Sequence, residues 1–136
     1  MTEQLGYRAI RELRGPLLLV GEIDGVGWDE FATVHVDGGE VRHGLVLEVD
    51  GSLATVQVLE GTDGLAAGGV EVRFANHPLH VMLGSEWLGR VCNGRGEPLD
   101  GGPPIAGPRS APVNGWPLNP VHRDPPQDPV ITGVST

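Results

Sequence analysis

The chain has 136 residues and a net charge of −9, and all nine of its basic residues are arginines. Glycine (22) and proline (12) make up a quarter of the chain, which excludes a helical bundle or a coiled coil because both residues interrupt helices. No apolar run approaches the roughly 18 residues of a membrane-spanning helix, and no basic cluster suggests binding to nucleic acid or to an anionic membrane. The polar N-terminus, Met1–Gln4, argues against a secretory signal, and the single Cys92 suits a reducing compartment.

Apolar and polar residues alternate through the first half of the chain, a period that is typical of half-buried β-strands. In chain order, the predicted strands are Tyr7–Leu13, Leu17–Val20, Phe31–Val36, Val41–Val49, Leu53–Leu59 and Val70–Phe74. The turns Asp37–Gly39 and Asp50–Gly51 supply residues that tolerate the positive φ of tight hairpins. Six short strands joined in this way predict a mainly β protein with a small antiparallel barrel, because closure removes exposed strand edges.

The second half has a different composition. Ten of the twelve prolines lie between Pro98 and Pro129, so we expect an extended segment rather than helices or central strands. Because its aliphatic residues are sparse, we expect residues from about Gly101 onward to be poorly ordered in the isolated chain. A disordered tail is one interpretation; Trp116, set in the turn-rich stretch Val113–Pro120, favours a segment that packs on another surface.

Histidines raise the question of a metal site. His77 and His80 are three residues apart, but they do not lie on a predicted helix, so the spacing alone does not bring the rings to one face. His35 and His43 can approach across a hairpin, yet no Cys/His cluster has the spacing of zinc ligands. We therefore expect no metal site.

The sequence also lacks a recognisable catalytic or cofactor-binding arrangement. No serine lies in a Gly-x-Ser-x-Gly turn, and we interpret Cys92 as a packed residue of a short apolar strand, Leu88–Cys92. The glycine-rich stretch Gly89–Pro98 contains no lysine and is followed by prolines instead of a helix, so it is not a phosphate-binding loop. We predict no catalytic residue and no cofactor site in this chain.

Four stretches resemble one protein family. The run Leu88–Pro103, which contains Gly-Arg-Val-Cys-Asn-Gly-Arg-Gly-Glu-Pro-Leu-Asp-Gly, is similar to the segment that joins the barrel to the nucleotide domain in rotary ATPases. Gly15–Val20, Val56–Leu65 and Asn114–Arg123 resemble the B subunit of V-type and archaeal A-type ATPases. The tail Ile131–Thr136 resembles the segment that precedes that subunit's central nucleotide-binding fold.

The resemblance implies structural roles for two groups of residues. The linker motif comprises Gly89, Arg90, Asn93, Gly94, Gly96, Pro98 and Asp100. The motif ahead of the nucleotide domain comprises Asn114, Gly115, Pro117, Asn119, Pro120, Arg123, Thr132 and Gly133. Leu59 and Cys92 stand where the family usually has phenylalanine, which loosens packing, and Pro129 and Ile131 replace an aromatic residue and an amide near the tail.

The resemblance also implies a function. Residues 1–75 correspond to the N-terminal β-barrel, and residues 76–136 to a linker and the incomplete start of the central nucleotide-binding domain, without a P-loop. The chain is then a structural part of the non-catalytic B subunit of a proton- or sodium-transporting ATPase or ATP synthase. Its barrel is expected in the crown of the soluble, cytoplasmic head, with the catalytic A subunit and the peripheral stalk as partners.

By the same resemblance, ATP and ADP belong to the full-length protein, and this chain by itself is not an enzyme. An alternative is a free-standing barrel module that is derived from the B subunit and lacks motor function. A further alternative is an unrelated small barrel that acts through its histidines.

Overall fold

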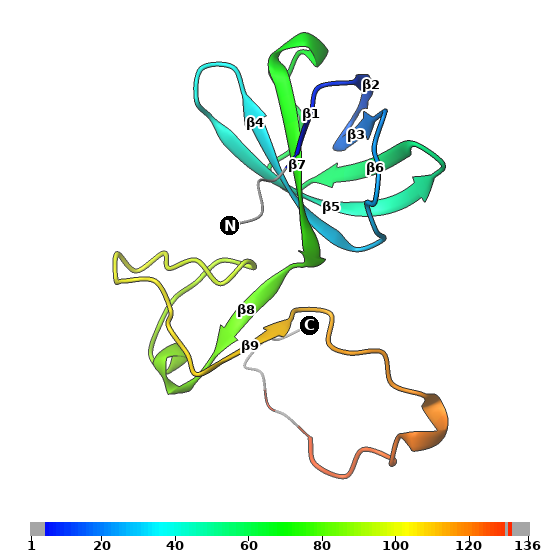
Figure 1. Cartoon of the computed structure of the whole chain (residues 1–136). Helices are drawn as coiled ribbons and strands as arrows, with labels where there is room; N and C mark the ends of the chain where they lie inside the picture. Colours follow the sequence, from blue (N-terminus) through cyan, green and yellow to red (C-terminus); the bar gives the residue numbers. More distant parts are fainter. Residues whose placement is uncertain (1–4, 130, 132–136) are drawn as a thin grey trace.

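The computed structural model describes residues 5–129 and 131, and its main feature is one curled antiparallel sheet (Figure 1). The strands of this sheet are β1 (Gly6–Tyr7), β2 (Ile10–Arg14), β3 (Leu17–Val20), β4 (Glu30–Val36), β5 (Val41–Asp50), β6 (Leu53–Val58) and β7 (Val70–Pro78). They lie in the order β1-β7-β4-β5-β6-β3-β2, and a short 3-10 turn, η1 (Ala67–Gly69), precedes β7. Within the described residues, no helix is long and apolar enough to cross a membrane.

The N-terminal segment reaches both edges of the curled sheet. β1 pairs with β7, whereas β2 pairs with β3, and only Arg8 and Ala9 separate the two strands along the chain. The backbone amide of Gly21 donates to the carbonyl of Ala9 at 2.7 Å, which fixes this break. The predicted mainly β fold with an antiparallel barrel is confirmed, and its first predicted strand is divided into β1 and β2. The strand expected at Val70–Phe74 is longer and continues to Pro78.

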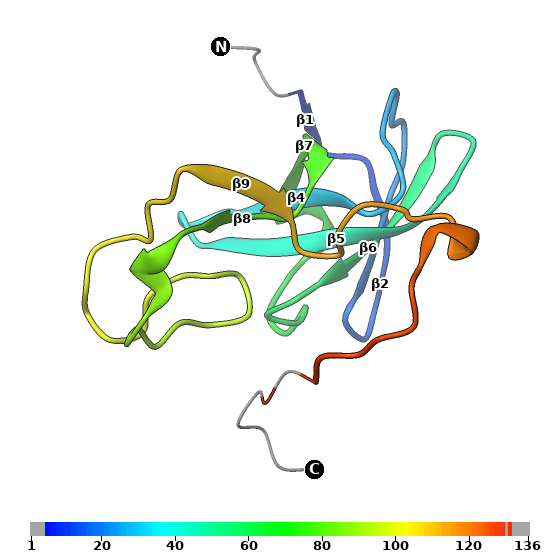
Figure 2. The same ribbon diagram turned by 90° about the horizontal axis from the view of Figure 1, so that it is seen from below.

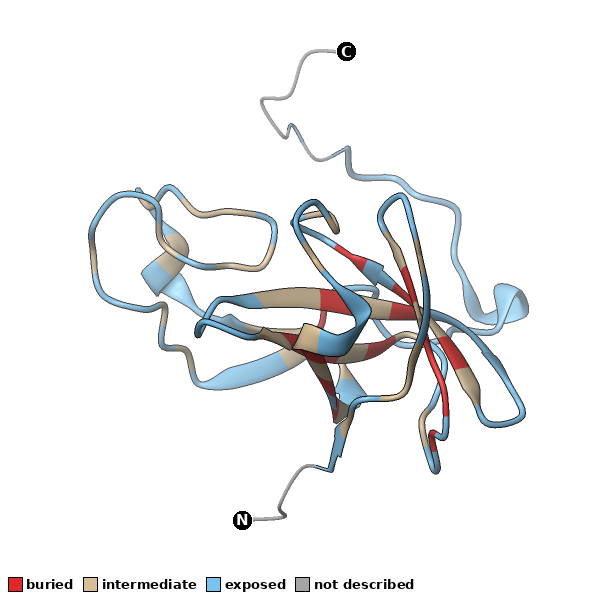
Figure 3. Ribbon diagram, turned by 90° about the horizontal axis from the view of Figure 1, so that it is seen from above, coloured by how far each residue is buried: buried red, intermediate tan, exposed pale blue. Residues whose placement is uncertain are grey.

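The core lies inside the curled sheet and consists mostly of valine (Figure 3). Its buried apolar residues are Leu18, Val20, Ile23, Ala32, Val34, Val46, Ala54, Val56, Val58, Val70, Val72 and Phe74. Phe74 is the one aromatic side chain among them, and Tyr7 packs edge-on against it with ring centroids 5.5 Å apart. Small β-branched residues on alternate positions explain why the strands curl around a narrow interior.

Gly44 marks the closest approach inside the sheet. A Cβ atom built on Gly44 would lie 2.6 Å from the Val56 Cγ1 atom and 2.9 Å from the carbonyl oxygen of Gln57, which is fixed in β6. Because backbone cannot move aside cheaply, we expect Gly44→Ala to lower the free energy of unfolding by about 1–3 kcal/mol. Gly68→Ala is the matched control, since nothing lies within 4 Å of its Cβ position. Equal unfolding midpoints in urea for the two variants would contradict this account.

The second half contains a small sheet that the proline content did not predict. β8 (His80–Leu83) pairs antiparallel with β9 (Arg109–Pro112), and they form a separate two-stranded sheet beside the barrel (Figures 1 and 2). A strand fits here because Pro112 ends β9, where a missing amide donor costs least. The expectation of a strand at Leu88–Cys92 is wrong: these residues follow a 3-10 turn, η2 (Ser85–Trp87), and Cys92 makes only an isolated bridge to Pro98.

Beyond β9 the chain is extended and exposed, apart from the turn η3 (Pro120–His122) (Figure 2). The expectation of poor order from about Gly101 onward did not allow for β9, which has a partner strand in this chain. For residues 115–129 it stays a prediction. We expect the amides without a described acceptor, those of Trp116, Leu118 and Asn119 and of residues 124–129, to exchange with solvent at nearly unprotected rates, whereas Val113, whose amide donates to the carbonyl of Leu79 at 2.8 Å, is protected. Protection throughout 115–129 in hydrogen-exchange measurements on the monomer would contradict it.

Candidate functional site

The linker motif folds into a short hairpin that projects from the small sheet toward the barrel. The amide of Leu99 donates to the carbonyl of Val91 at 2.7 Å, and Cys92 forms a bridge to Pro98. At the tip, the amide of Gly96 donates to the carbonyl of Asn93 at 3.0 Å and closes a turn. We call residues 91–99 the linker hairpin.

The side chain of Asn93 organises the tip of the linker hairpin. Its Oδ1 atom accepts hydrogen bonds from the amides of Arg95 (2.9 Å) and Glu97 (3.0 Å), and its Nδ2 atom donates to Glu97 Oε2 at 2.7 Å. Gly96 has a φ of +82°, and a Cβ atom there would lie 3.0 Å from the Trp87 ring. Asparagine and glycine are therefore needed at these positions by the turn itself.

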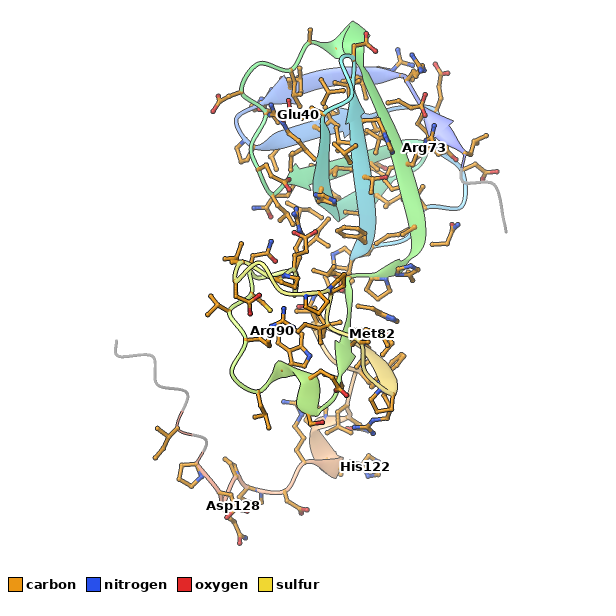
Figure 4. All side chains as sticks on the ribbon, turned by 90° about the vertical axis from the view of Figure 1, so that its left-hand side faces the viewer. Glu40, Arg73, Met82, Arg90, His122 and Asp128 are labelled. Carbon is orange, nitrogen blue, oxygen red and sulfur yellow. The ribbon has the colours of Figure 1, made fainter. Side chains whose placement is uncertain are left out.

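An ion pair closes the base of the hairpin. Arg90 Nε and Nη2 donate to Asp100 Oδ2 and Oδ1 at 2.6 and 2.9 Å, and Nη2 also donates to the carbonyl of Pro103 at 2.9 Å. Asp100 also accepts hydrogen bonds from the amides of Gly102 and Val91. The Arg90 guanidinium holds the pKa of Asp100 well below its usual range. Figure 4 shows Arg90 on the part of the chain below the barrel, away from Arg73 on the barrel.

The structure thus gathers the seven residues of the linker motif in one loop. Gly89 has a φ of +74° and turns the chain into the hairpin, whereas Gly94 has open space around its Cβ position and needs no positive φ. Their described hydrogen bonds stabilise the fold of the loop itself.

The second motif is spread along the chain instead of being gathered. Asn114 Nδ2 contacts both carboxylate oxygens of Asp29 on the barrel at 2.9 Å, and Gly115, with a φ of +72°, completes a turn from Pro112. Asn119 Oδ1 accepts from the amide of Val121 at 3.1 Å and so caps η3, which begins with Pro120. Two further members, Pro117 and Arg123, are exposed, and Thr132 and Gly133 lie outside the described residues.

A charged cluster between the barrel and the hairpin was missed by sequence reasoning. Arg95 Nη1 contacts Glu60 Oε1 and lies 2.5 Å from His43 Nδ1, and Arg95 Nη2 donates to Glu97 Oε2 at 2.6 Å. The amide of His43 donates to Glu60 Oε2 at 2.8 Å, and the His43 ring stacks on Phe31. No sequence signal joins Glu60 to Arg95, because 35 residues separate them.

The cluster stabilises the charged form of Glu60. Burial raises the pKa of Glu60, but hydrogen bonds from the His43 amide and ring and from Arg95 more than offset that effect and lower it to about 2. The carboxylate is therefore ionised at every pH at which the protein is expected to work. A permanently charged carboxylate that already accepts several hydrogen bonds is suited to holding the fold together rather than to transferring protons.

We expect Glu60→Gln to destabilise the protein in a pH-dependent way. A carboxyl group whose pKa falls from 4.5 to about 2 on folding contributes stability above pH 4.5, and that contribution is lost as the pH falls toward 2. We expect a cost of about 1–2 kcal/mol at pH 6, reduced from the full linkage value because the side chain is about one-third exposed. Urea unfolding at pH 6 and pH 2 measures it; a difference between wild type and variant that does not shrink at pH 2 would contradict the assignment.

The histidines that raised the metal question are placed differently from the expectation. The rings of His77 and His80 lie 5.2 Å apart, one near the end of β7 and the other at the start of β8. His35 lies 3.4 Å from the Thr33 hydroxyl, and His43 belongs to the charged cluster. In the part of the chain that the structure describes, no group of three or more His, Cys, Asp or Glu residues is arranged to hold a metal ion.

Comparison with known proteins assigns the family. Residues 10–76, which contain β2 to β6 and most of β7, match the β-barrel domain of the ATP synthase alpha/beta family. Over 129 residues, or 95% of this chain, the sequence is 48% identical to the B subunit of the A-type ATP synthase from Aeropyrum pernix, of which the chain spans 28%. The chain therefore belongs to the ATP synthase alpha/beta family through its β-barrel domain, and it is similar to an N-terminal part of the B subunit of A-type enzymes.

Proposed function

We propose that this chain is a structural and assembly part of a non-catalytic B subunit in an A- or V-type ion-transporting ATP synthase or ATPase. The observation that carries the proposal is the 48% identity over 129 residues to the B subunit of an A-type enzyme, which extends past the barrel into the linker hairpin and the segment after it. The ion that is transported, and whether the enzyme makes or consumes ATP, are properties of the whole complex.

The barrel is the proposed assembly surface. On the outer side of β5, Leu47 is 44% exposed, at a position where a fully solvated strand would carry a polar residue. Glu40 on the barrel is paired with Arg42, whereas Glu48, which follows Leu47 in the chain, is exposed (Figure 4 labels Glu40). The exposed Leu47 with acidic residues near it supports docking against another protein of the complex, with charge guiding the choice of partner.

In the proposed complex, the barrel takes its place in the crown of the head, next to the barrels of the catalytic A subunits, and contacts the peripheral stalk. Residues 1–75 would form this barrel domain, and residues 76–136 the linker and the start of the nucleotide-binding domain. The complex would be cytoplasmic and attached to the membrane through its other subunits. ATP and ADP would bind to parts of the full-length subunits, and we expect this chain alone neither to bind nor to hydrolyse them.

The pairwise interaction tests the proposal. The chain is mixed with the A subunit of the same organism, and the masses of the eluting species are measured by size-exclusion chromatography with light scattering. We expect a complex that contains both proteins, and we expect no phosphate release from ATP by the chain alone. A Leu47→Asp variant should weaken the complex, whereas the exposed Leu88→Asp on the linker should not; separate elution of wild-type chain and A subunit would contradict the proposal.

A further inference from the structure

Three segments that are distant in sequence meet at one guanidinium group. His43 lies in β5, Glu60 follows the end of β6, and Arg95 occupies the tip of the linker hairpin. Arg95 uses Nη1 toward Glu60 and His43 on the barrel, and it uses Nη2 toward Glu97 on its own hairpin at 2.6 Å. One side chain therefore connects the two parts of the molecule.

Arg95 differs from an ordinary surface arginine. Its side chain is 19% exposed, whereas that of Arg73, which pairs with Glu71 on the barrel, is 44% exposed. The Nε atom of Arg95 is buried without a hydrogen-bond partner. Burial of an unpaired donor costs free energy, so the contacts of Nη1 and Nη2 must outweigh that cost for the guanidinium to stay in place.

The linker hairpin and the barrel do not close completely on each other. An open groove of about 490 Å³ lies between them, and its lining includes Leu45 and Leu59 of the barrel and Asn93 and Gly94 of the hairpin. Among the described residues, the polar contacts that join residues 91–99 to the barrel are those of Arg95 with Glu60 and His43.

We propose that Arg95 acts as a bridge that holds the linker hairpin at one fixed position on the barrel, so that the two move as a single body. We call Arg95, Glu60 and His43 the Arg95 bridge. Movement relative to the barrel would then be confined to the extended residues after Gly115. These contacts lie within the chain, so the Arg95 bridge does not require an A subunit.

The distance between the hairpin tip and the barrel tests the proposal. Spin labels are attached at Ser52→Cys, on the exposed turn between β5 and β6, and at Gly94→Cys, where a side chain meets no atom within 4 Å. The native thiol is removed by Cys92→Ser. Double electron–electron resonance then gives the distribution of distances between the labels, which we expect to be single and narrow in this background.

Three further variants distinguish the effect of losing the Arg95 bridge from the effect of a general loss of stability. Arg95→Gln and Glu60→Gln should each widen the distribution at least twofold. Glu60 lies outside the hairpin, so widening in Glu60→Gln cannot result from loss of the hairpin's own contacts. Arg73→Gln, which breaks a barrel ion pair elsewhere, is the control and should leave the width unchanged. An unchanged width in both Arg95→Gln and Glu60→Gln would overturn the proposal.

Discussion

Replacement of Phe74 by alanine is expected to lower the free energy of unfolding by about 3–5 kcal/mol. Phe74 is 4% exposed and is the one large aromatic residue in a core built mostly of valine. Its ring also supports Tyr7 in β1, which pairs with β7 and holds one edge of the sheet. The substitution thus removes a large buried volume and one of the contacts that hold β1 in place.

Urea unfolding followed by circular dichroism measures this loss. Leu88→Ala is the matched control, because Leu88 is also a large apolar residue but is 82% exposed, and we expect its free energy of unfolding to change by less than about 0.5 kcal/mol. A loss of less than about 1 kcal/mol for Phe74→Ala would show that the interior of the barrel can collapse around the missing ring, contrary to the described core.

Replacement of Glu30 by alanine is expected to cost about 3 kcal/mol. The carboxylate is 5% exposed and accepts hydrogen bonds from the amides of Gly27, at 2.8 Å, and Asn76, at 2.6 Å. Asn76 lies where β7 bends toward β8, and its φ is +60°. The substitution leaves two amide donors without an acceptor, and one of them belongs to this strained bend.

Comparison with Glu30→Gln separates the hydrogen bonds from the volume of the side chain. Glutamine fills similar space but presents one acceptor oxygen, so we expect an intermediate loss of stability. Glu48→Ala removes an exposed carboxylate and should have little effect. Equal stability of Glu30→Ala and Glu48→Ala in urea would contradict the role of Glu30 at the bend of β7.

The barrel strands could be predicted because each has one face in the core, and this leaves a period of two in the sequence. The stretch Val70–Phe74 shows that period clearly, and it is buried on alternate residues in β7. The break between β1 and β2 was not predictable, since it depends on which edge each piece pairs with. β8 and β9 were missed because both strands are short and neither alternates between buried and exposed residues: His80 and Val81 are half-buried, whereas Met82 and Leu83 are exposed.

In the candidate site too, the contacts between residues close in sequence could be predicted, whereas the contacts between distant segments could not. The resemblance of the linker motif identified Arg90, Asn93 and Asp100, which the structure places in local contacts within about ten residues of each other. The Arg95–Glu60 contact joins two regions that become neighbours only when the barrel has formed. A residue pair of that kind has no local signature, and single residues such as Glu60 read as ordinary surface charges.

The proposed assembly role in the ATP synthase head is tested most directly by reconstituting the head from A and full-length B subunits in the presence of an excess of this chain, with native mass spectrometry of the products. We predict complexes in which the chain occupies B positions beside A subunits, together with a lower yield of complete heads. An unchanged yield, with all of the chain detected at its free mass, would contradict the account.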